Sequence, residues 1–482
     1  MTQVKSFGTL IADSAAADPS APAVTCGDVT ITRAQLNSRT NRRARHYAAR
    51  GAAHGSLIVL QLPNSVELVE SVVAAWKLGA TPLVIPPAMP AAERAPVLEL
   101  GPAALVIDAP DPDGWLGQSD QPLPFAAPPN WRASTSGGST GRPKLIYSTR
   151  PGSADPAERT LYLRQGGAVA VPGPLYHGAP FMFMTFGLMR GKHVGLLPKF
   201  DPEQTLKLIA DIGADYVLLV PTMMNRISKL PAGVRDSYDL SSLQTVLHLG
   251  ASCPPALKRE WISWLGAKKI HELYAGTEGQ ATTWIRGDEW LDHPGSVGRP
   301  AGGAQMRAFD EAGRQLPPGE VGEIYLRPPA GAPRAYRYAG ATARTRGEWE
   351  SLGDIGWVDA DGYVYILDRR TDMILSGGAN VYPAEVEAAL EAHPDVHAAA
   401  VIGLPDADLG QRVHAVIEPA AAARETLTAD ALREHLKDLL VRYKTPRTFE
   451  FVPGPLRDEA GKVRRSALAA ARAHGSPVPG GC

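Results

Sequence analysis

One stretch of the sequence gathers the residue types that bind phosphate. Ser134–Lys144 reads STSGGSTGRPK, with three glycines among five hydroxyl residues and a lysine at its end. Glycines let the backbone bend so that several amide N–H groups can face one anion, while hydroxyls add donors and lysine adds a compact positive charge. The Gly-Lys-Ser/Thr ending of the Walker pattern is absent. Phosphate binding is one interpretation, and a flexible surface linker is the alternative.

Carboxylates and a second lysine occur in three later segments. Tyr274–Glu278 (YAGTE) follows a predicted strand, Leu352–Asp354 (LGD) precedes a turn, and Lys462 lies in Pro455–Leu468 (PLRDEAGKVRRSAL). A carboxylate suits a hard cation that neutralises phosphate, and it can also accept from two neighbouring sugar hydroxyls. A mobile lysine stabilises negative charge that develops in a reaction. Alone, each segment is also explained by a strand end, a solvated aspartate or a basic surface turn.

Taken in order, these segments resemble the signatures of the adenylate-forming (AMP-binding) superfamily, which contains acyl-CoA synthetases, peptide-synthetase adenylation domains and luciferases. The resemblance covers nearly the whole chain and includes seven motifs in the family order. Tyr274–Glu278 corresponds to the family's Tyr-Gly-x-Thr-Glu, and Ser136–Lys144 corresponds to its phosphate loop. The wording of His293–Pro300 (HPGSVGRP) looks closest to fatty-acyl and bile-acid-type CoA ligases.

The resemblance implies a set of nucleotide contacts. The phosphate loop would grip the triphosphate, the segment Leu247–Cys253 would pack on adenine beside the tyrosine of the YAGTE motif, and an aspartate and an arginine would contact ribose. The implied nucleotide-binding residues are Ser136, Gly137, Gly138, Ser139, Thr140, Gly141, Lys144, Gly250, Ala251, Tyr274, Ala275, Asp354 and Arg369. Thr277 is implied near phosphate, and Glu278 is implied to hold Mg²⁺, the expected metal cofactor.

The resemblance also implies the catalytic groups. Lys462 would reach the attacking carboxylate and the α-phosphate, and together with His177, Thr277 and Glu278 it forms the predicted catalytic set. His177, in Pro174–Gly178 (PLYHG), would swing as coenzyme A enters.

The resemblance further predicts the hinge and the thiol tunnel. Arg369 and Thr371 are the predicted hinge between a large and a small domain. Gly377 and Gly378 would lie beside the pantetheine arm in the second conformation.

The acyl pocket is predicted from fewer signals. His177, Phe181, Met223 and Gly276 are the expected lining residues, although the stretch Phe181–Met184 is more typical of core packing. No acidic residue stands at the position that peptide-synthetase domains use for an amino group. The expected substrate is therefore an apolar carboxylic acid without an amino group.

The expected reaction is that of an AMP-forming acyl-CoA ligase, an acid–thiol ligase. The acid attacks the α-phosphate of ATP to form acyl-AMP, and the thiol of coenzyme A then displaces AMP. Ala275, Leu352 and Thr371 depart from the family's Gly, Thr and Asp or Lys. Alternatives therefore stay open: an enzyme that takes acyl-AMP made elsewhere and only forms the thioester, a ligase that loads the phosphopantetheine of a carrier protein, or an inactive nucleotide-binding regulator.

The elements that must position these residues alternate between strands and helices in the first half. Strands are predicted at Ser56–Pro63 and Pro82–Pro86 around a helix at Ser65–Leu78, and further elements follow the same order. The later elements are a helix at Pro202–Ile212 and strands at Tyr216–Val220, Leu243–Leu249 and Lys269–Leu273. Such crossovers favour parallel sheets covered by helices, which is an α/β fold.

The chain changes character after about residue 317. Pro317–Leu326 and Gly353–Leu367 predict short antiparallel strands in a small barrel-like part. Beyond them we expect a mobile α+β domain with a helix from Ala384, strands at His397–Ile402 and Val413–Ile417, and a helix from Ala429. The predicted organisation is a large AMP- and acyl-binding domain over 1–368, a hinge at 369–371 and a small domain over 372–482 that carries the catalytic lysine.

Composition limits the class of protein. With 482 residues the chain exceeds one ordinary core, and its net charge of -1 gives no support for a nucleic-acid or anionic-membrane partner. Cys26, Cys253 and Cys482 show no metal-ligand spacing; Cys253 is expected to be buried, and a cytoplasmic location is expected. No membrane span is predicted, and the last nine residues are expected to fray. The expected partners are the acid, ATP or AMP and coenzyme A, while a carrier protein and a homodimer remain open.

Overall fold

The computed structural model describes residues 4–111, 113–124, 126–136, 143–156, 163–370, 372–376, 379–458 and 461–473, without the side chains of residues 136 and 473. Tertiary contacts divide the chain into two compact units. Unit 1 comprises Met1–Gly250, Leu265–Thr282 and Pro328–Ala343. Unit 2 comprises Ala251–Trp264, Thr283–Arg327 and Arg344–Cys482.

Unit 1 contains helices interleaved with short strands. Its helices are α1 (Phe7–Ala17), α2 (Arg33–Ala49), α3 (Val66–Lys77), α4 (Ala91–Leu100), α5 (Gly178–Met189), α6 (Pro202–Ile212), α7 (Pro221–Ser228) and α8 (Ala232–Arg235). Its strands are β1 (Lys5–Ser6), β2 (Pro22–Cys26), β3 (Val29–Thr32), β4 (Leu57–Leu60), β5 (Thr81–Val84), β6 (Leu105–Ile107), β7 (Ala133–Ser136), β8 (Lys144–Ser148), β9 (Ser153–Ala154), β10 (Ala168–Val171), β11 (His193–Leu196), β12 (Tyr216–Leu219), β13 (Thr245–His248), β14 (Ile270–Ala275) and β19 (Tyr336–Ala339).

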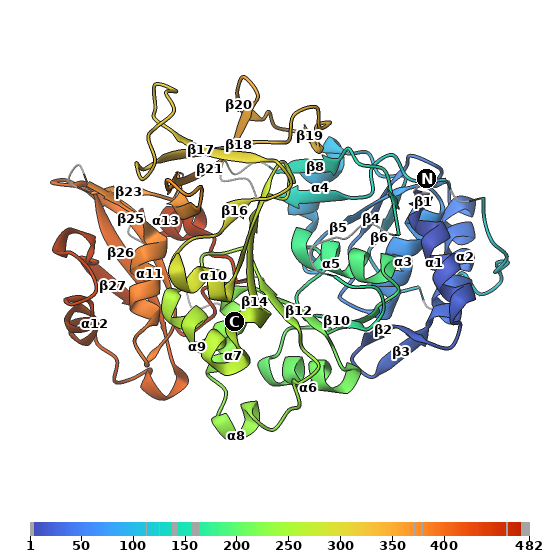
Figure 1. The fold of residues 1–482 in the computed structure, drawn as a ribbon, viewed down its shortest axis with the longest axis horizontal. Helices are drawn as coiled ribbons and strands as arrows, with labels where there is room; N and C mark the ends of the chain where they lie inside the picture. Colours follow the sequence, from blue (N-terminus) through green and yellow to red (C-terminus); the bar gives the residue numbers. More distant parts are fainter. Residues whose placement is uncertain are drawn as a thin grey trace. The chain divides into compact units, whose positions relative to one another are not determined.

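Two sheets organise unit 1. In one sheet the order is β14-β13-β12-β10-β11-β2-β3, and its neighbours from β14 to β2 pair in parallel. In the other sheet the order is β19-β8-β7-β5-β4-β6, with parallel pairing among β7, β5, β4 and β6. The strand β4 (LIVL) is buried at all four positions, as expected for a strand covered on both faces. Helices α1, α2 and α3 pack together beside this sheet (Figure 1).

Local sequence signals explain several of these elements. Helix α6 begins at an N-cap, Asp201, whose carboxylate accepts from the Gln204 amide, and it carries Pro202 in its first turn. It ends at Gly213, whose φ of 58° is the left-handed conformation that glycine adopts without strain. Because start and stop signals are both local, the predicted range of this helix agrees with the observed one.

Unit 2 is richer in antiparallel strands. Its helices are α9 (Pro255–Leu265, whose last residue is assigned to unit 1), α10 (Gly287–Asp292), α11 (Pro383–Glu391), α12 (Ala429–Leu436) and α13 (Arg465–Ala473). Its strands are β15 (Thr282–Arg286, whose first residue is assigned to unit 1), β16 (Arg299–Pro300), β17 (Gln305–Phe309), β18 (Gly322–Arg327), β20 (Arg344–Arg346), β21 (Trp349–Val358), β22 (Val364–Arg369), β23 (Ile374–Ser376), β24 (Ala379–Val381), β25 (Val396–Asp406), β26 (Gly410–Pro419) and β27 (Thr448–Phe451).

Two five-stranded sheets organise unit 2. The first has the order β17-β18-β21-β20 with β22 also paired to β21, and all its pairs are antiparallel. The second has the order β24-β23-β26-β25, and β27 joins β26 in parallel. Helix α11 packs on β25 (Figure 1), and the buried core there includes Val386, Leu390, Val401 and Leu432. The small α+β assembly expected after residue 370 thus has its own apolar core.

Most expected elements are present, and the α/β fold class is confirmed. The structure corrects one expectation, because Cys253 is partly exposed rather than buried. It lies in the loop between β13 and α9, outside the apolar strand that suggested its burial. Within the residues that the structure describes, no helix is both long and apolar enough to cross a membrane.

Candidate active site

The lysine that closes the predicted phosphate loop meets the predicted metal ligand in unit 1. Lys144 Nζ donates to Glu278 Oε1 at 3.3 Å, across 134 residues of sequence. It also donates to the Tyr338 hydroxyl at 3.2 Å and stands 4.2 Å from the centroid of the Tyr338 ring. Tyr338 in turn donates to Glu278 Oε1. Lys144, Tyr338 and Glu278 come from distant segments and form one polar cluster, in which Glu278 is 7% exposed.

Strand pairing positions this cluster. Lys144 begins β8, and β8 pairs antiparallel with β19 so that Tyr338 lies opposite Ile146. Glu278 follows β14 in a tight turn in which the Gly279 amide donates to the Gly276 carbonyl at 3.0 Å. The turn presents Thr277 and Glu278 just beyond the carboxyl end of a parallel strand, where α/β folds bind ligands.

Sequence reasoning missed Tyr338. Burial, together with the hydrogen bond to Glu278 and its negative charge, raises the pKa of the Tyr338 hydroxyl. The hydroxyl consequently stays protonated and acts as a donor at neutral pH. The signal available in the sequence was the alternating segment Tyr336–Ala339 (YRYA), which predicts a strand with two tyrosines on one face, but nothing local links it to Glu278.

A buried arginine in the same unit was also missed. Arg132 precedes β7 and is 8% exposed. Its Nη1 donates to the Gly178 carbonyl at 2.9 Å, and its Nη2 donates to the Thr277 carbonyl at 3.1 Å. Burial lowers the pKa of Arg132 to about 10, and the negative charge of Glu278 opposes that shift. The guanidinium therefore remains charged at neutral pH beside the predicted metal segment.

The predicted ribose residues meet in unit 2. Asp354 in β21 is paired in register with Arg369 at the end of β22, and Arg369 Nε lies 3.4 Å from Asp354 Oδ1. Asp354 is 5% exposed, whereas 64% of the Arg369 side chain is accessible. The structure thus places next to one another two residues that the family order assigned to one sugar.

Lys462 lies close enough to Arg369 for their charges to interact. Desolvation, and then the positive charge of Arg369, lower the pKa of Lys462, while Asp458 opposes the shift. The residue as a whole is nevertheless exposed. Asp458 also shapes the turn, since its Oδ1 accepts from the Lys462 amide at 2.9 Å.

The segment around the predicted hinge is held by buried carboxylates. Asp368 accepts from the amides of Arg369 and Ala384 at 2.7 and 2.8 Å, and so contacts the start of α11. Burial raises the pKa of Asp368 to about 6. Arg465 pairs with Glu387 at 2.7 Å and with Asp372 at 2.9 Å. Carboxylates therefore hold the chain on both sides of the predicted hinge: Asp368 binds the start of α11, and Asp372 pairs with Arg465.

The predicted acyl residues lie mainly in packed surroundings. Phe181 is 4% exposed and contacts the rings of Trp76 and Trp131 at centroid distances of 6.1 and 5.8 Å. Met223 is also buried. His177 is the N-cap residue of α5 and its ring lies 4.5 Å from that of Tyr176. Phe181 therefore belongs to an aromatic core, which is the alternative that its sequence context favoured.

The predicted adenine residues follow two parallel strands. Tyr274 and Ala275 end β14, and Gly276 opens the turn that carries Glu278. Gly250 follows β13 with a φ of 88°, a conformation that a side chain would strain. Ala251 follows Gly250 and is exposed. Their roles at the adenine stay predictions.

Several predicted residues lie outside the described part of the chain. These are Gly137, Gly138, Ser139, Thr140 and Gly141 of the phosphate loop, Thr371 of the hinge, and Gly377 and Gly378 of the thiol tunnel. The backbone of Ser136 ends β7, but its side chain is not described. Cys482 and the last nine residues also fall outside it.

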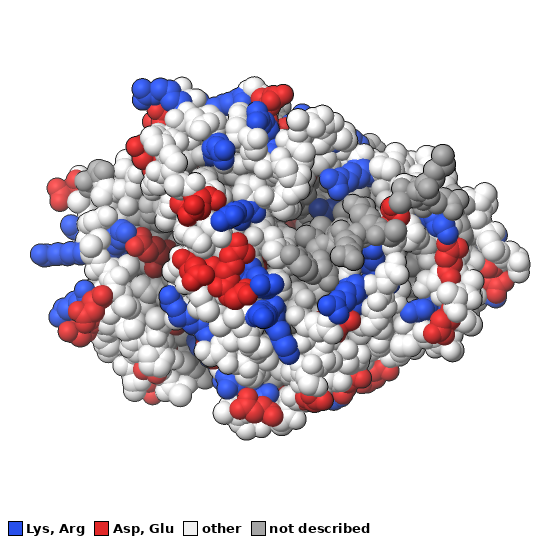
Figure 2. Space-filling view, viewed as in Figure 1, with Lys and Arg blue, Asp and Glu red and all other residues white. Residues whose placement is uncertain are grey.

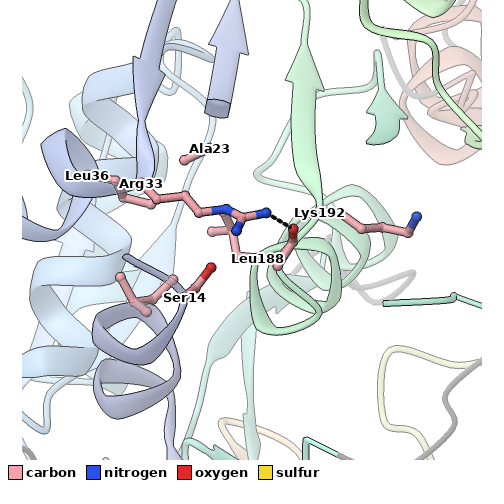
Figure 3. Close-up of a pocket in the computed structure, with 8 residues that line it drawn as sticks. Ser14, Ala23, Arg33, Leu36, Leu188 and Lys192 are labelled. Atoms are coloured by element: carbon pink, nitrogen blue, oxygen red, sulfur yellow. Dashed lines mark hydrogen bonds between the residues drawn. The ribbon is translucent and has the colours of Figure 1, made fainter. Parts of the chain in front are cut away.

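One small cavity in unit 1 is lined by none of the described residues of the predicted site. This cavity of about 10 Å³, which is room for about one water, lies among Ser14, Arg33, Leu188 and Lys192 (Figure 3). There the Arg33 guanidinium donates to the Gly191 carbonyl at 2.6 Å, which ties α2 to the end of α5. This cavity is a packing gap rather than a substrate site.

Charges of both signs are mixed on the surface shown in Figure 2. Among the coloured residues of that face, Lys and Arg alternate with Asp and Glu without a large area of one sign. This agrees with the net charge of -1 and places phosphate recognition on local groups such as Lys144.

Comparisons with known proteins agree with the motifs. The model of the AMP-binding enzyme family matches residues 11–123 and 134–336, and that of the AMP-binding enzyme C-terminal domain matches residues 385–462. The fatty acid–[acyl-carrier-protein] ligase ScoC of Streptomyces coeruleorubidus is 29% identical over 492 residues, covering 94% of this chain and 93% of the relative. The long-chain-fatty-acid–CoA ligase FadD13 of Mycobacterium tuberculosis is 31% identical over 481 residues, covering 92% and 93%.

A solved structure shares the fold. The o-succinylbenzoate-CoA synthetase MenE of Bacillus subtilis, determined with its acyl-adenylate intermediate, superposes with a TM-score of 0.82 at 23% identity and covers 98% of this chain and 99% of its own. At this identity the likeness supports the fold, while the family models and FadD13 carry the assignment. The family expected from the motifs is confirmed, and the chain belongs to the AMP-binding enzyme family.

Proposed function

We propose that this chain is an AMP-forming acyl-CoA ligase, which adenylates an apolar carboxylic acid with ATP and transfers the acyl group to the thiol of coenzyme A. The observation that carries the proposal is the contact between Lys144 and Glu278. The motifs assign these residues separately to ATP phosphate and to its metal, and they meet across 134 residues of sequence. The names of FadD13 and ScoC, both of which refer to fatty acids, support an apolar acid.

The donor set around Glu278 fits a magnesium ion shared with ATP. Lys144 and Tyr338 both donate to Oε1 of this carboxylate. Within the described residues there is no cluster of three His, Cys, Asp or Glu side chains that could hold a metal alone. Mg²⁺ commonly binds through one carboxylate, waters and substrate phosphates, so Glu278 would hold it together with ATP. When bound, the ion neutralises triphosphate charge.

The protein groups then divide the work of adenylation. Lys144 donates to phosphate oxygens, Asp354 and Arg369 orient the ribose, and Lys462 stabilises the charge that develops as the carboxylate oxygen bonds to the α-phosphorus and pyrophosphate leaves. In the second step the coenzyme A sulfur attacks the acyl carbon and AMP departs with the electron pair. His177 acts as the gate residue, and its side chain swings aside so that the thiol can enter.

The test is ATP–pyrophosphate exchange over a panel of decanoate, ferulate, benzoate and a steroid acid, with a parallel thioester assay. Exchange with at least one acid, and its thioester with coenzyme A, is the expected result. Thioester from supplied acyl-AMP without exchange would favour the half-enzyme, which the departures Ala275 and Leu352 suggest. Transfer to a carrier-protein phosphopantetheine but not to coenzyme A would favour a carrier-loading ligase of the kind that the name of ScoC describes.

We also propose the finer organisation of the protein: a large domain over 1–368, a hinge at 369–371 and a small domain over 372–482 that turns between the two steps. Two contacts lie at this boundary, from the Ala384 amide to Asp368 and between Arg465 and Asp372, and both would rearrange during the turn. Limited proteolysis with and without coenzyme A would test the boundary. Gel filtration would test for a homodimer, and cell fractionation would test the proposed cytoplasmic location.

Tyr338→Phe tests the hydroxyl that joins Lys144 to Glu278. The variant keeps the ring beneath the ammonium and removes the two hydrogen bonds of the hydroxyl, from Lys144 and to Glu278. We therefore expect about a 10-fold lower kcat/KM for MgATP in the exchange assay. The matched control is Tyr238→Phe, because Tyr238 lies in the same unit and its hydroxyl donates to an exposed glutamate, Glu203, at 2.9 Å. Equal exchange in the two variants would contradict a role for Tyr338 at the phosphates.

A further inference from the structure

Arg132 joins two segments that are assigned to different substrates. Gly178 follows the gate residue His177 at the start of α5, and Thr277 precedes the predicted metal ligand Glu278. Arg132 lies 46 residues before the first segment and 145 before the second. One guanidinium donates to a carbonyl of each, at 2.9 and 3.1 Å. A single side chain therefore holds both the backbone beside the gate residue His177 and the turn that carries Glu278.

The space around this guanidinium is closely filled. A methyl group placed on Gly178 would lie 3.2 Å from Arg132 Nη1 and 3.4 Å from Thr277 Cγ2. The gate backbone, the guanidinium and the threonine side chain are thus in direct reach of one another. A shift of either segment must move the shared hydrogen bonds, because a packed interior leaves little room for an independent adjustment.

An aromatic cluster holds Arg132 in place. Its Cζ lies 4.7 Å from the centroid of the Trp131 ring, which contacts Phe181 and Phe7 at 5.8 and 6.3 Å. Trp76 Nε1 donates to the Trp131 carbonyl at 2.8 Å. The guanidinium donates to the carbonyl oxygens of Gly178 and Thr277, a pattern that fixes two backbone segments.

We propose that Arg132 is a positioning residue that couples the binding of the acid to the binding of ATP. This inference rests on the proposed function and assigns its site a residue that the motifs do not contain. MgATP would order the turn at Thr277. Because the same guanidinium also binds the Gly178 carbonyl, that backbone becomes ordered too, and His177 is held in the conformation that accepts the acid. The coupling is reciprocal, so the bound acid raises the affinity for the nucleotide by the same factor.

Calorimetry with α,β-methylene-ATP and Mg²⁺ tests the coupling without turnover. The acid is whichever member of the panel supports exchange in the native chain, and its dissociation constant is measured with and without the nucleotide analogue. We expect at least about a 5-fold tightening of acid binding in the native chain, a factor near 1 in Arg132→Met, and an intermediate factor in Arg132→Lys, which keeps the charge but reaches only one carbonyl.

Val72→Ala is the control for stability. Val72 is fully buried in α3 and contributes to the core rather than to the site, so its truncation lowers the melting temperature while the coupling factor stays at the native value. A purely structural Arg132 would behave in the same way. A native coupling factor in Arg132→Met, or a factor of 1 in the native chain, overturns the proposal. If Arg132→Met does not fold, the coupling factor of Arg132→Lys decides between a coupling role and a purely structural role.

Hydrogen exchange gives a second readout that needs no acid. Binding of α,β-methylene-ATP with Mg²⁺ should slow amide exchange in the peptide 176–184 of the native chain by about 10-fold, with no change in Arg132→Met. This experiment distinguishes a failure of the proposed ligase function from a failure of the proposed coupling. Absence of pyrophosphate exchange with every acid counts against the ligase, whereas nucleotide protection of the gate that survives in Arg132→Met counts against the coupling.

Discussion

Lys462→Ala is expected to lower ATP–pyrophosphate exchange by about 10²–10³-fold, because it removes the cation that stabilises charge at the α-phosphate in the transition state. Formation of thioester from supplied acyl-AMP should fall by less than about 5-fold, since that step no longer transfers a phosphoryl group. The measurement is the ratio of the two rates in one preparation. A loss that is equal in both assays would point to misfolding or to a role outside adenylation.

Two variants sharpen this experiment. Lys437→Ala removes an exposed lysine of unit 2 that pairs with Glu434, and it should leave both rates unchanged. Lys462→Arg keeps the charge and provides a pH readout. Because the pKa of Lys462 is lowered in the structure, its ammonium loses the proton at a lower pH than an ordinary lysine does. Exchange should therefore decline on the alkaline side in the native chain, and the decline should move to higher pH in Lys462→Arg.

Glu278→Gln is expected to lower exchange by about 10²-fold or more and to raise the Mg²⁺ concentration needed for half-maximal rate. The amide keeps the volume and can still accept from Lys144 and Tyr338, but it lacks the negative charge that a hard cation requires. Exchange is measured over a Mg²⁺ titration at saturating ATP. Calorimetric binding of Mg²⁺ with α,β-methylene-ATP gives a readout that is independent of catalysis.

Glu99→Gln is the matched control for Glu278. Glu99 is an exposed glutamate of α4 in the same unit, and its neutralisation changes the net charge by the same amount. If Glu278→Gln retained native Mg²⁺ dependence, the carboxylate would serve only to hold Lys144 and Tyr338. Combination with Tyr338→Phe would then show one shared loss rather than additive losses, because residues of one hydrogen-bond network act together.

Local chemistry determined much of what was predictable. The bounds of α6 follow from its cap, its proline and its terminal glycine, all within the helix or next to it. The order of the motifs around Lys144, Glu278 and Lys462 indicated the family, which the family models confirm. Such signals are readable because they depend on neighbours in sequence, whatever the rest of the chain does.

The tertiary structure decided which of those residues meet. Tyr338 contacts Lys144 across 194 residues only because β19 pairs with β8 in one register, and a shift of one residue would turn its side chain to the other face. The pairing of Asp354 with Arg369 likewise depends on the register of β21 and β22. No local signal indicates the contacts of Arg132, because its two carbonyl partners lie 46 and 145 residues away.

Burial was the other property that local pattern left open. Phe181 and Met223 are apolar residues after glycine or proline turns, a description that suits a substrate pocket as well as the core packing that is more typical of the stretch Phe181–Met184. The rings of Trp76 and Trp131, from two other segments, place Phe181 in the core. The sequence by itself thus determined the chemical groups and their order, whereas strand register and packing decided their contacts, because both depend on segments that are brought together only by folding.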